Sequence, residues 1–259
     1  MNKFVVNATN SNLHYSYFIP IVSLMWKTIG YTPITLLFGS DWAGNTKTNY
    51  ILDNIKKHSA VWSLPYTPGF KESTCVQISR IFASASLDFS LDDYILTSDA
   101  DMIPLSKSWF NSQDHNKKFH IFGADAYGGA RFPICYLGAT VANWREIMGI
   151  QVSGINNAME TYMDKNRDNW DYDELLFTEK IRKWLSQCQL INRGWTEGRA
   201  NDRLDRVSWN WQNQTNLLDC HSIRPGYMHW AELSCLFKTY CSDSDYNYIK
   251  NYTETFNSL

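Results

Sequence analysis

The first forty residues contain a strand, a helix and a second strand, and this order constrains the fold more than any other feature of the chain. Residues 3–6 are an apolar run that ends in the polar cluster 7–12. Apolar residues then recur at helical spacing between Phe18 and Ile29, and residues 34–38 form a second apolar run. A helix between two strands joins parallel neighbours, so the sequence predicts a βαβ unit within a parallel sheet.

The rest of the chain alternates between the same two patterns. Its length of 259 residues and its 44% hydrophobic content fit one α/β domain with a sizeable core. Residues 63–70 have the composition of a loop, and the stretch after Gly194 is irregular. The predicted helices cover 49–57, 75–85, 143–148, 155–164, 171–185 and a tail from 232, and the predicted strands cover 94–98, 120–123 and 134–140.

Charge and targeting signals exclude several classes of protein. A formal net charge of -2 argues against a nucleic-acid binder or an anionic-membrane binder. No run of about 18 apolar residues occurs, so we expect no transmembrane segment, and the start lacks the apolar core of a signal peptide. The six cysteines form no C-x-x-C pair, so we expect reduced, mostly buried thiols and a cytoplasmic protein.

Two aspartates follow the strand predicted at 94–98. In an extended backbone, residues two apart project to the same side, so Asp99 and Asp101 would face one ion together, with the small Ala100 between them. Two carboxylates at a strand end suit a hard divalent cation that takes further oxygens from substrate phosphates. The same spacing also occurs in acidic turns that bind no ion.

Other polar residues follow the neighbouring strands, where ligands bind in a parallel sheet. Asn7, Ala8 and Thr9 follow the first strand, and Asp41 follows the second. We expect these residues to hold the base and ribose of a nucleotide, although a capping turn and a plain loop explain them as well. Arg80 lies off the apolar stripe of its helix, so it either forks onto a phosphate or the base or is a solvated surface arginine.

Taken in order, these features resemble the GT-A glycosyltransferases. The set comprises the first strand, the helix with Trp26-Lys-Thr-Ile-Gly-Tyr31, the strand before Asp41, the helix with Arg80 and the D-x-D strand. In detail the chain resembles the small soluble sugar transferases of large algal DNA viruses, from Lys3 to about Trp230. The resemblance implies an α/β fold in which a Rossmann-like nucleotide half (about 1–105) is fused to a mixed-sheet acceptor half (about 106–230), before a helical tail (231–259).

The resemblance also implies an activity and a metal. Such an enzyme moves a sugar from a nucleotide diphosphate donor, with UDP favoured, to a hydroxyl of a glycan or glycoprotein. Asp99 and Asp101 would coordinate Mn²⁺ or Mg²⁺ on the donor diphosphate. A histidine near the end of the domain often adds a third ligand, and His221 and His229 are the candidates. Alternation in an extended segment places Asp219 and His221 on one face, which favours His221.

The catalytic base is expected around residues 170–174. Inverting enzymes of the resembled family place an Asp or Glu at the start of a helix beneath the acceptor, which points to Asp173 or Glu174. That carboxylate would take the proton of the acceptor hydroxyl as the sugar bond breaks. Asp171 and Glu174 also match a capping pair at a helix start. Inversion follows from such a base, whereas retention stays open because the sequence does not show which face of the donor the acceptor approaches.

The second half of the chain is expected to recognise the acceptor. The candidates are the polar loop 125–131, the rings of Tyr136, Trp144 and Trp209, and the charged residues Arg203, Asp205 and Arg206, each of which has a purely structural alternative. Two other functions compete with glycosyl transfer. One is an aspartate-nucleophile phosphatase, in which the D-x-D usually follows the first strand; the other is a non-catalytic sugar-binding domain.

Overall fold

The predicted βαβ unit lies at the centre of the sheet. In the computed structural model, which describes residues 1–259 except 151–153, 165, 168, 196–199, 208 and 210–215, β1 (Lys3–Thr9) pairs in parallel with β2 (Thr32–Phe38). Helix α2 (Ile19–Ile29) crosses between them, with Pro20 in its first turn. Gly30 ends the helix at a φ of 104°, a left-handed conformation that favours glycine.

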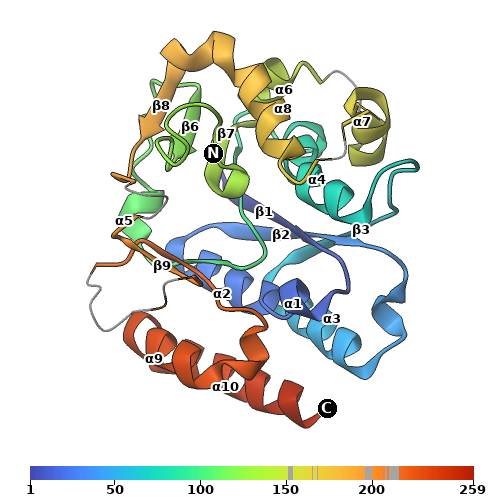
Figure 1. Ribbon diagram of the computed structural model, residues 1–259, viewed down its shortest axis with the longest axis vertical. Coiled ribbons are helices and arrows are strands. Elements are labelled where there is room, and N and C mark those ends of the chain that lie inside the picture. The colour runs from blue at the N-terminus through green and yellow to red at the C-terminus, as the bar shows by residue number, and fades with distance from the viewer. Residues whose placement is uncertain (151–153, 165, 168, 196–199, 208, 210–215) are drawn as a thin grey trace.

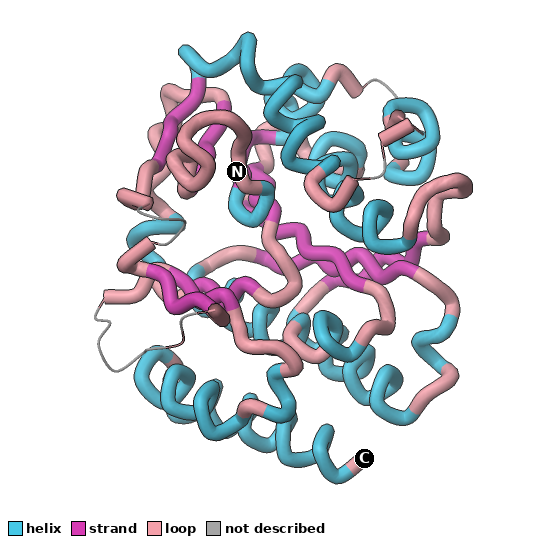
Figure 2. The backbone as a smooth tube through the Cα atoms, in the orientation of Figure 1, coloured by secondary structure: helices cyan, strands magenta, loops and turns pink. Residues whose placement is uncertain are grey.

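A mixed sheet extends from this unit in both directions (Figures 1 and 2). Within the described residues it has seven strands in the order β3-β2-β1-β4-β7-β6-β8. The chain moves from β1 outward to β3 and then returns to place β4 on the other side of β1. The strands that complete it are β3 (Ala60–Leu64), β4 (Tyr94–Thr97), β6 (Phe119–Phe122), β7 (Leu137–Thr140) and β8 (Cys188–Ile191).

A smaller sheet adjoins the D-x-D segment. It consists of β5 (Met102–Pro104), β10 (Asp219–His221) and β9 (Arg203–Asp205), with β10 in the middle. β10 runs antiparallel to β5 and places His221 opposite Met102, directly after Asp101. The smaller sheet therefore brings a segment from the end of the chain beside the acidic pair, although more than a hundred residues separate them.

Helices cover both faces of the large sheet, and each face has its own hydrophobic core (Figure 1). One layer contains α1 (Leu13–Ser16), α2, α3 (Thr46–His58), α9 (Trp230–Tyr240) and α10 (Asp243–Ser258). The other contains α4 (Glu72–Ser86), α6 (Val141–Met148), α7 (Ile155–Tyr162) and α8 (Tyr172–Ile181). A short helix, α5 (Lys107–Phe110), and the 3₁₀ turns η1 (Asp41–Ala43), η2 (Ile134–Tyr136), η3 (Arg182–Gln187) and η5 (Gly226–Met228) connect these elements.

Several short elements differ from the sequence prediction. The first strand continues through Thr9, where a polar turn was expected, because β2 supplies backbone partners as far as that residue. β3 and β8 lie at the two ends of the large sheet, and short edge strands have little apolar pattern to reveal them. The tail from 232 contains two helices, since α9 and α10 are separated by the capping residue Ser242.

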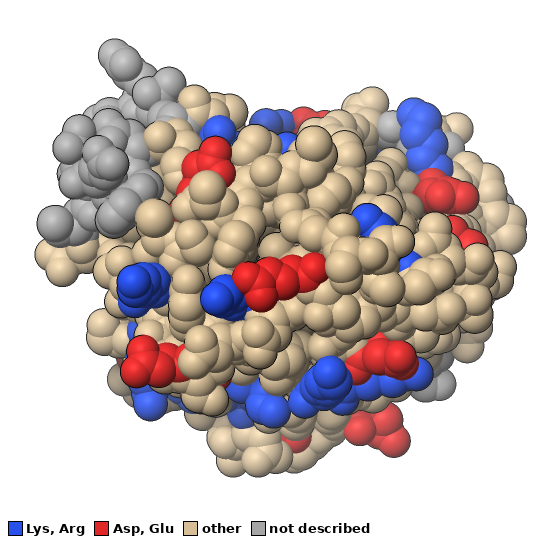
Figure 3. Space-filling model, turned by 90° about the horizontal axis from the view of Figure 1, so that it is seen from below, with Lys and Arg blue, Asp and Glu red and all other residues tan. Residues whose placement is uncertain are grey.

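The expected thiol state agrees with the structure, in which all six cysteines are free and four of them are buried. No helix in the described part of the chain has both the length and the apolar composition needed to cross a membrane. Viewed from the side of α9 and α10, basic and acidic side chains lie interspersed on the visible surface (Figure 3). That face therefore carries no patch of a single sign.

Gly138 in β7 is required by close packing rather than by its backbone angles. A Cβ atom there would lie 1.9 Å from the hydroxyl oxygen of the buried Tyr94 on β4. Because that hydroxyl also contacts His120 Nδ1 at 3.2 Å, it has little room to move. We expect Gly138→Ala to lower the free energy of unfolding by about 1–3 kcal/mol, as overpacking does in other cores.

Urea denaturation measures this effect, and Gly44→Ala is the matched control. A Cβ at Gly44 would meet nothing closer than the Asp41 carbonyl oxygen at 3.6 Å, an ordinary contact. The control should therefore change the free energy of unfolding by less than about 0.5 kcal/mol. Equal effects of the two substitutions would contradict the packing argument.

Candidate functional site

The candidate site is a cavity of about 520 Å³ at the carboxyl ends of β1 and β4. The chain reverses its direction across the sheet at these two strands, and ligands of α/β sheets bind at such switch points. A second hollow, of about 620 Å³, lies near Trp62 and Arg145 and contains none of the residues predicted from the sequence. The arrangement of the strands therefore selects the first cavity as the site.

Most of the predicted residues line this cavity. They are Ala8, Thr9, Arg80, Asp99, Ala100, Asp101, Asp173, Glu174 and His221. Three others do not. Asn7 is fully buried, because the longer β1 turns it onto the same face as the core residue Val5. Asp41 accepts a hydrogen bond from the Ser11 hydroxyl, and His229 lies beside Glu232 at the start of α9.

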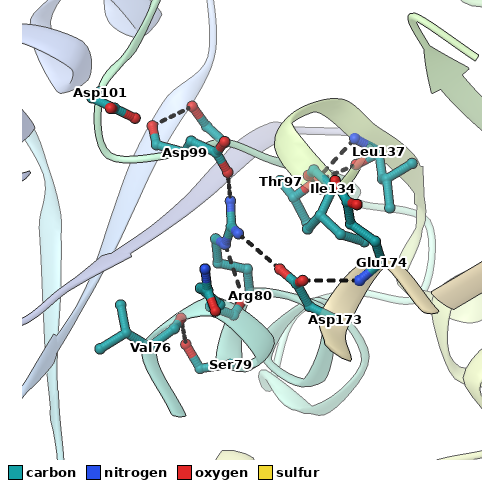
Figure 4. Close-up of polar contacts among 12 residues, drawn as sticks. Val76, Ser79, Arg80, Thr97, Asp99, Asp101, Ile134, Leu137, Asp173 and Glu174 are labelled. Carbon is teal, nitrogen blue, oxygen red and sulfur yellow. Dashed lines mark hydrogen bonds and ion pairs between the residues drawn. The ribbon is translucent and has the colours of Figure 1, made fainter. Parts of the chain in front are cut away.

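Arg80 joins the acidic pair to the helix that carries the predicted base (Figure 4). Its side chain is buried, so the predicted alternative of a solvated surface arginine is wrong. One end of the guanidinium contacts Asp99 Oδ1, and Nη2 lies 3.3 Å from Asp173 Oδ2. The charge of Arg80 is thus shared between two carboxylates. Removing one partner of a buried ion pair of this kind strongly destabilises the folded protein.

The two carboxylates at the start of α8 differ in their surroundings. Asp173 is buried against Arg80, and burial raises its pKa to about 6, although Arg80 opposes the shift. Glu174 faces the cavity, accepts a hydrogen bond from the Tyr127 hydroxyl at 3.0 Å and lies 3.0 Å from Arg131 Nε. Burial, together with the neighbouring Asp173, raises the pKa of Glu174 to about 7. Glu174 therefore titrates near neutral pH with its carboxylate directed at the cavity.

The alternative that Asp171 and Glu174 form a capping pair is wrong. Asp171 is the N-cap residue of α8, but its side chain makes no capping hydrogen bond. It pairs instead with Arg131, which also contacts Glu174. The guanidinium of Arg131 lies over the ring of Tyr127, 4.3 Å from its centroid. These contacts hold the rim of the cavity together around Glu174.

Asp101 is surrounded by basic groups. Arg206 Nη1, Arg224 Nε and His221 Nε2 lie 3.1, 3.3 and 3.6 Å from the same carboxylate oxygen, Oδ2. His221 Nδ1 lies 3.3 Å from Asp205 on the adjoining β9. Although burial disfavours its charged form, the two carboxylates raise the pKa of His221 to about 9. Sequence reasoning overlooked Arg224 and assigned Arg206 to the acceptor, because no local pattern marks their approach to Asp101.

Asp99 and Asp101 were predicted to lie in an extended backbone and to face one ion together, but the backbone between β4 and β5 is not extended. Both lie in the turn between β4 and β5, and their side chains point to different partners (Figure 4). Asp99 contacts Arg80, whereas Asp101 contacts Arg206, Arg224 and His221. In the described residues, no group of three or more metal-binding side chains converges as if to hold an ion. The donor types nevertheless suit Mn²⁺ or Mg²⁺, because carboxylate oxygens and an imidazole nitrogen line one cavity.

Asp219 has a structural role rather than a ligand's role. It is fully buried and receives Arg203 Nη2 at 2.7 Å and Arg193 Nη1 at 2.9 Å. Arg203 therefore joins β9 to β10 in the smaller sheet, which is the structural role given above as the alternative to acceptor binding. The loop residue Asp125 also has a structural role, since its carboxylate accepts hydrogen bonds from the backbone N–H groups of residues 193–195.

The rings predicted to bind the acceptor are not the ones at the cavity. Tyr136 and Trp144 are fully buried core residues, and Trp209 is not among the residues that line the cavity. Trp170 and Tyr127 line it instead, with 68% and 39% of their surfaces exposed. Tyr127 belongs to the loop 125–131, which the sequence analysis named as a candidate for acceptor recognition, whereas only its exposure distinguishes Trp170 from a core aromatic.

Comparison with known proteins identifies the fold. No family model and no curated protein matches the chain. Among solved structures, apo GlyE, a glycosyltransferase of Streptococcus pneumoniae TIGR4, matches all of this chain and 64% of its own with a TM-score of 0.51 at 12% identity. The fold is GT-A.

Two further glycosyltransferases match with lower scores. The galactosyltransferase LgtC, in complex with donor and acceptor sugar analogs, has a TM-score of 0.49 at 13% identity over 98% of this chain and 95% of its own. A Drosophila β1,4-galactosyltransferase 7 mutant, in complex with manganese, UDP-Gal and xylobiose, has a TM-score of 0.45 at 12% identity over 85% and 71%. The mixed sheet and the match to GlyE confirm the α/β prediction, whereas nothing in these comparisons supports the viral part of the resemblance.

Proposed function

We propose that this protein is a metal-dependent glycosyltransferase that moves a sugar from a UDP-linked donor to a hydroxyl of a glycan. The observation that carries the proposal is the cavity at the β1/β4 switch point, which Asp99, Asp101, His221 and Glu174 all line. The GT-A fold agrees with this function but does not specify it. The viral resemblance and a cytoplasmic location remain predictions from the sequence.

Asp99, Asp101 and His221 are the residues that would hold the divalent cation. When bound, such a cation acts as a Lewis acid that neutralises the charge of the departing diphosphate. Ala8, Thr9 and Ala100 line the same cavity at the ends of the paired strands β1 and β4, and we assign them to the nucleoside. Arg80 fixes Asp99 in relation to Asp173, so it acts as a positioning residue between the donor and acceptor sides.

Glu174 is our choice of general base. Both carboxylates line the cavity, but Asp173 is more deeply buried and paired with Arg80. Glu174 is more exposed and has a pKa of about 7, near the value at which a base is most effective. A base on the acceptor side implies inversion at the anomeric carbon. Proton NMR of the first-formed product decides this point, because a retained configuration would remove Glu174 from the role of base.

A screen of nucleotide sugars tests the proposed function. Thermal unfolding is measured with each donor in the presence and absence of Mn²⁺, since a ligand that binds only the folded state raises the unfolding temperature. UDP release then measures turnover. Metal-independent sugar binding without turnover would favour a sugar-binding domain, and hydrolysis of a generic phosphate ester would favour a phosphatase.

Asp101→Asn is expected to abolish the Mn²⁺-dependent part of the thermal shift and to weaken UDP binding about tenfold or more, because the cation loses a charged ligand. Calorimetric titration with UDP and Mn²⁺ measures the effect. Asp114→Asn, a substitution at a residue that does not line the cavity, is the control. An Asp101→Asn protein that binds UDP and Mn²⁺ like the wild type would refute the assigned metal site.

A further inference from the structure

Two arginines at the cavity share a single carboxylate oxygen as their partner. The side chains of Arg206 and Arg224 are partly exposed, and both reach Asp101 Oδ2, which also lies 3.6 Å from His221 Nε2. Only the Arg206 contact has the geometry of a hydrogen bond. A carboxylate oxygen has two lone pairs, so it does not satisfy three cationic partners fully. Most of the donor capacity of these two guanidinium groups is therefore not used by Asp101.

The neighbouring arginines of the same region are held quite differently. Arg203 shares its Nε hydrogen between the two carboxylate oxygens of Asp219 and donates a second hydrogen bond to Asp219 from Nη2. Arg193 is fully buried between Asp219 and Asp202. Their guanidinium groups are fixed inside the protein by forked contacts. Arg206 and Arg224 have no such fork with Asp101, so their movement would break far fewer contacts.

The charges around Asp101 balance one another in the ligand-free protein. Arg206 and Arg224 bring two positive charges to this cluster, and Asp101 and Asp205 bring two negative charges. The ring of Tyr15 supports Arg224 from the side, 4.5 Å from its guanidinium carbon. The two guanidinium groups beside Asp101 repel a divalent cation that approaches this carboxylate, and a diphosphate supplies the negative charge that the arginines lose when they leave it.

We propose that Arg206 and Arg224 exchange partners when the donor binds. In the ligand-free protein they neutralise Asp101, and with a donor present they move to the oxygens of its diphosphate while a divalent cation takes their place on Asp101. This inference rests on the proposed function. It predicts that the protein binds Mn²⁺ weakly by itself and strongly together with a diphosphate, because each ligand removes the obstacle to the other.

The first test uses the wild-type protein, with Mn²⁺ and UDP as probes. Calorimetric titration with Mn²⁺ is carried out without nucleotide, with UDP and with UMP. We expect UDP to tighten Mn²⁺ binding about tenfold or more, and UMP to do so much less, because UMP lacks the second phosphate. Equal affinity for Mn²⁺ with and without UDP would overturn the exchange.

The second test removes the arginines. In Arg206→Gln/Arg224→Gln, Mn²⁺ alone should bind about tenfold or more tightly than in the wild type, whereas UDP with Mn²⁺ should bind about tenfold or more weakly. A loss of UDP affinity without a gain in Mn²⁺ affinity would overturn the exchange. If UDP does not bind the wild type at all, both the proposed function and the exchange are wrong. If UDP binds the variant as it binds the wild type, only the exchange is wrong.

Two controls separate these effects from damage to the fold. Arg206→Lys/Arg224→Lys keeps both charges but loses the forked geometry, so it should bind Mn²⁺ alone like the wild type and UDP more weakly. Arg167→Gln removes an exposed arginine that pairs with Asp164 and Glu179, and it should change neither affinity. Circular dichroism checks that each variant is folded.

Discussion

Glu174→Gln is expected to lower kcat about 10²–10⁴-fold, the usual contribution of a general base. The substitution keeps the size of the side chain and its contact with Tyr127, but glutamine does not accept the acceptor's proton. Turnover is measured as UDP release with the donor identified by screening. Asp171→Asn is the matched control, because Asp171 pairs with the same Arg131 but contributes no base, so it should change kcat only a few-fold.

The pH profile distinguishes a base from a structural carboxylate. Since the pKa of Glu174 is raised to about 7, the ionised form that accepts a proton decreases as the pH falls through 7. We expect kcat/KM to fall about tenfold for each pH unit below that value in the wild type. Glu174→Gln should lose this limb of the profile. An unchanged acidic limb in the variant would assign the titration to another group.

Asp219→Asn is expected to lower the free energy of unfolding by about 3–5 kcal/mol, the cost of breaking a buried ion pair from one side. Asp219 is 0% exposed, and the substitution leaves two arginines with half of their compensating charge. Burial by itself would raise the pKa of Asp219, but Arg193 and Arg203 hold it below its usual value. Its stabilising contribution is thus present at neutral pH and is lost only in acid, as the pH falls through this lowered pKa.

Asp202→Asn provides the comparison. Asp202 pairs with the same Arg193 at 2.6 Å, but its side chain is 29% exposed, so solvent screens the pair. The control should lose less than about 1 kcal/mol. Urea denaturation of both variants measures the difference. Equal losses would show that the buried arrangement around Asp219 is not what stabilises the strand that carries His221.

The sequence predicted the elements whose pattern is local. The βαβ unit, the Arg80 helix and the strand before the D-x-D were found because apolar periodicity reflects which face of an element is buried. The polar ends of parallel strands placed Asp99 and Asp101 at the cavity, since such strands end at the same edge of the sheet, whereas Glu174 was predicted from the resemblance to inverting GT-A enzymes. The prediction failed for Asn7, because the strand is longer than its apolar run.

Only the tertiary structure decided which charges meet. Arg80 and Asp173 are 93 residues apart in the chain, and Arg206 and Asp101 are 105 apart, so no local pattern relates them. The sequence by itself determined the βαβ unit, the Arg80 helix and the strand before the acidic pair, because these elements depend on neighbouring residues. The partners of each carboxylate depend on how the second sheet packs beside the first, and packing is a property of the whole folded chain.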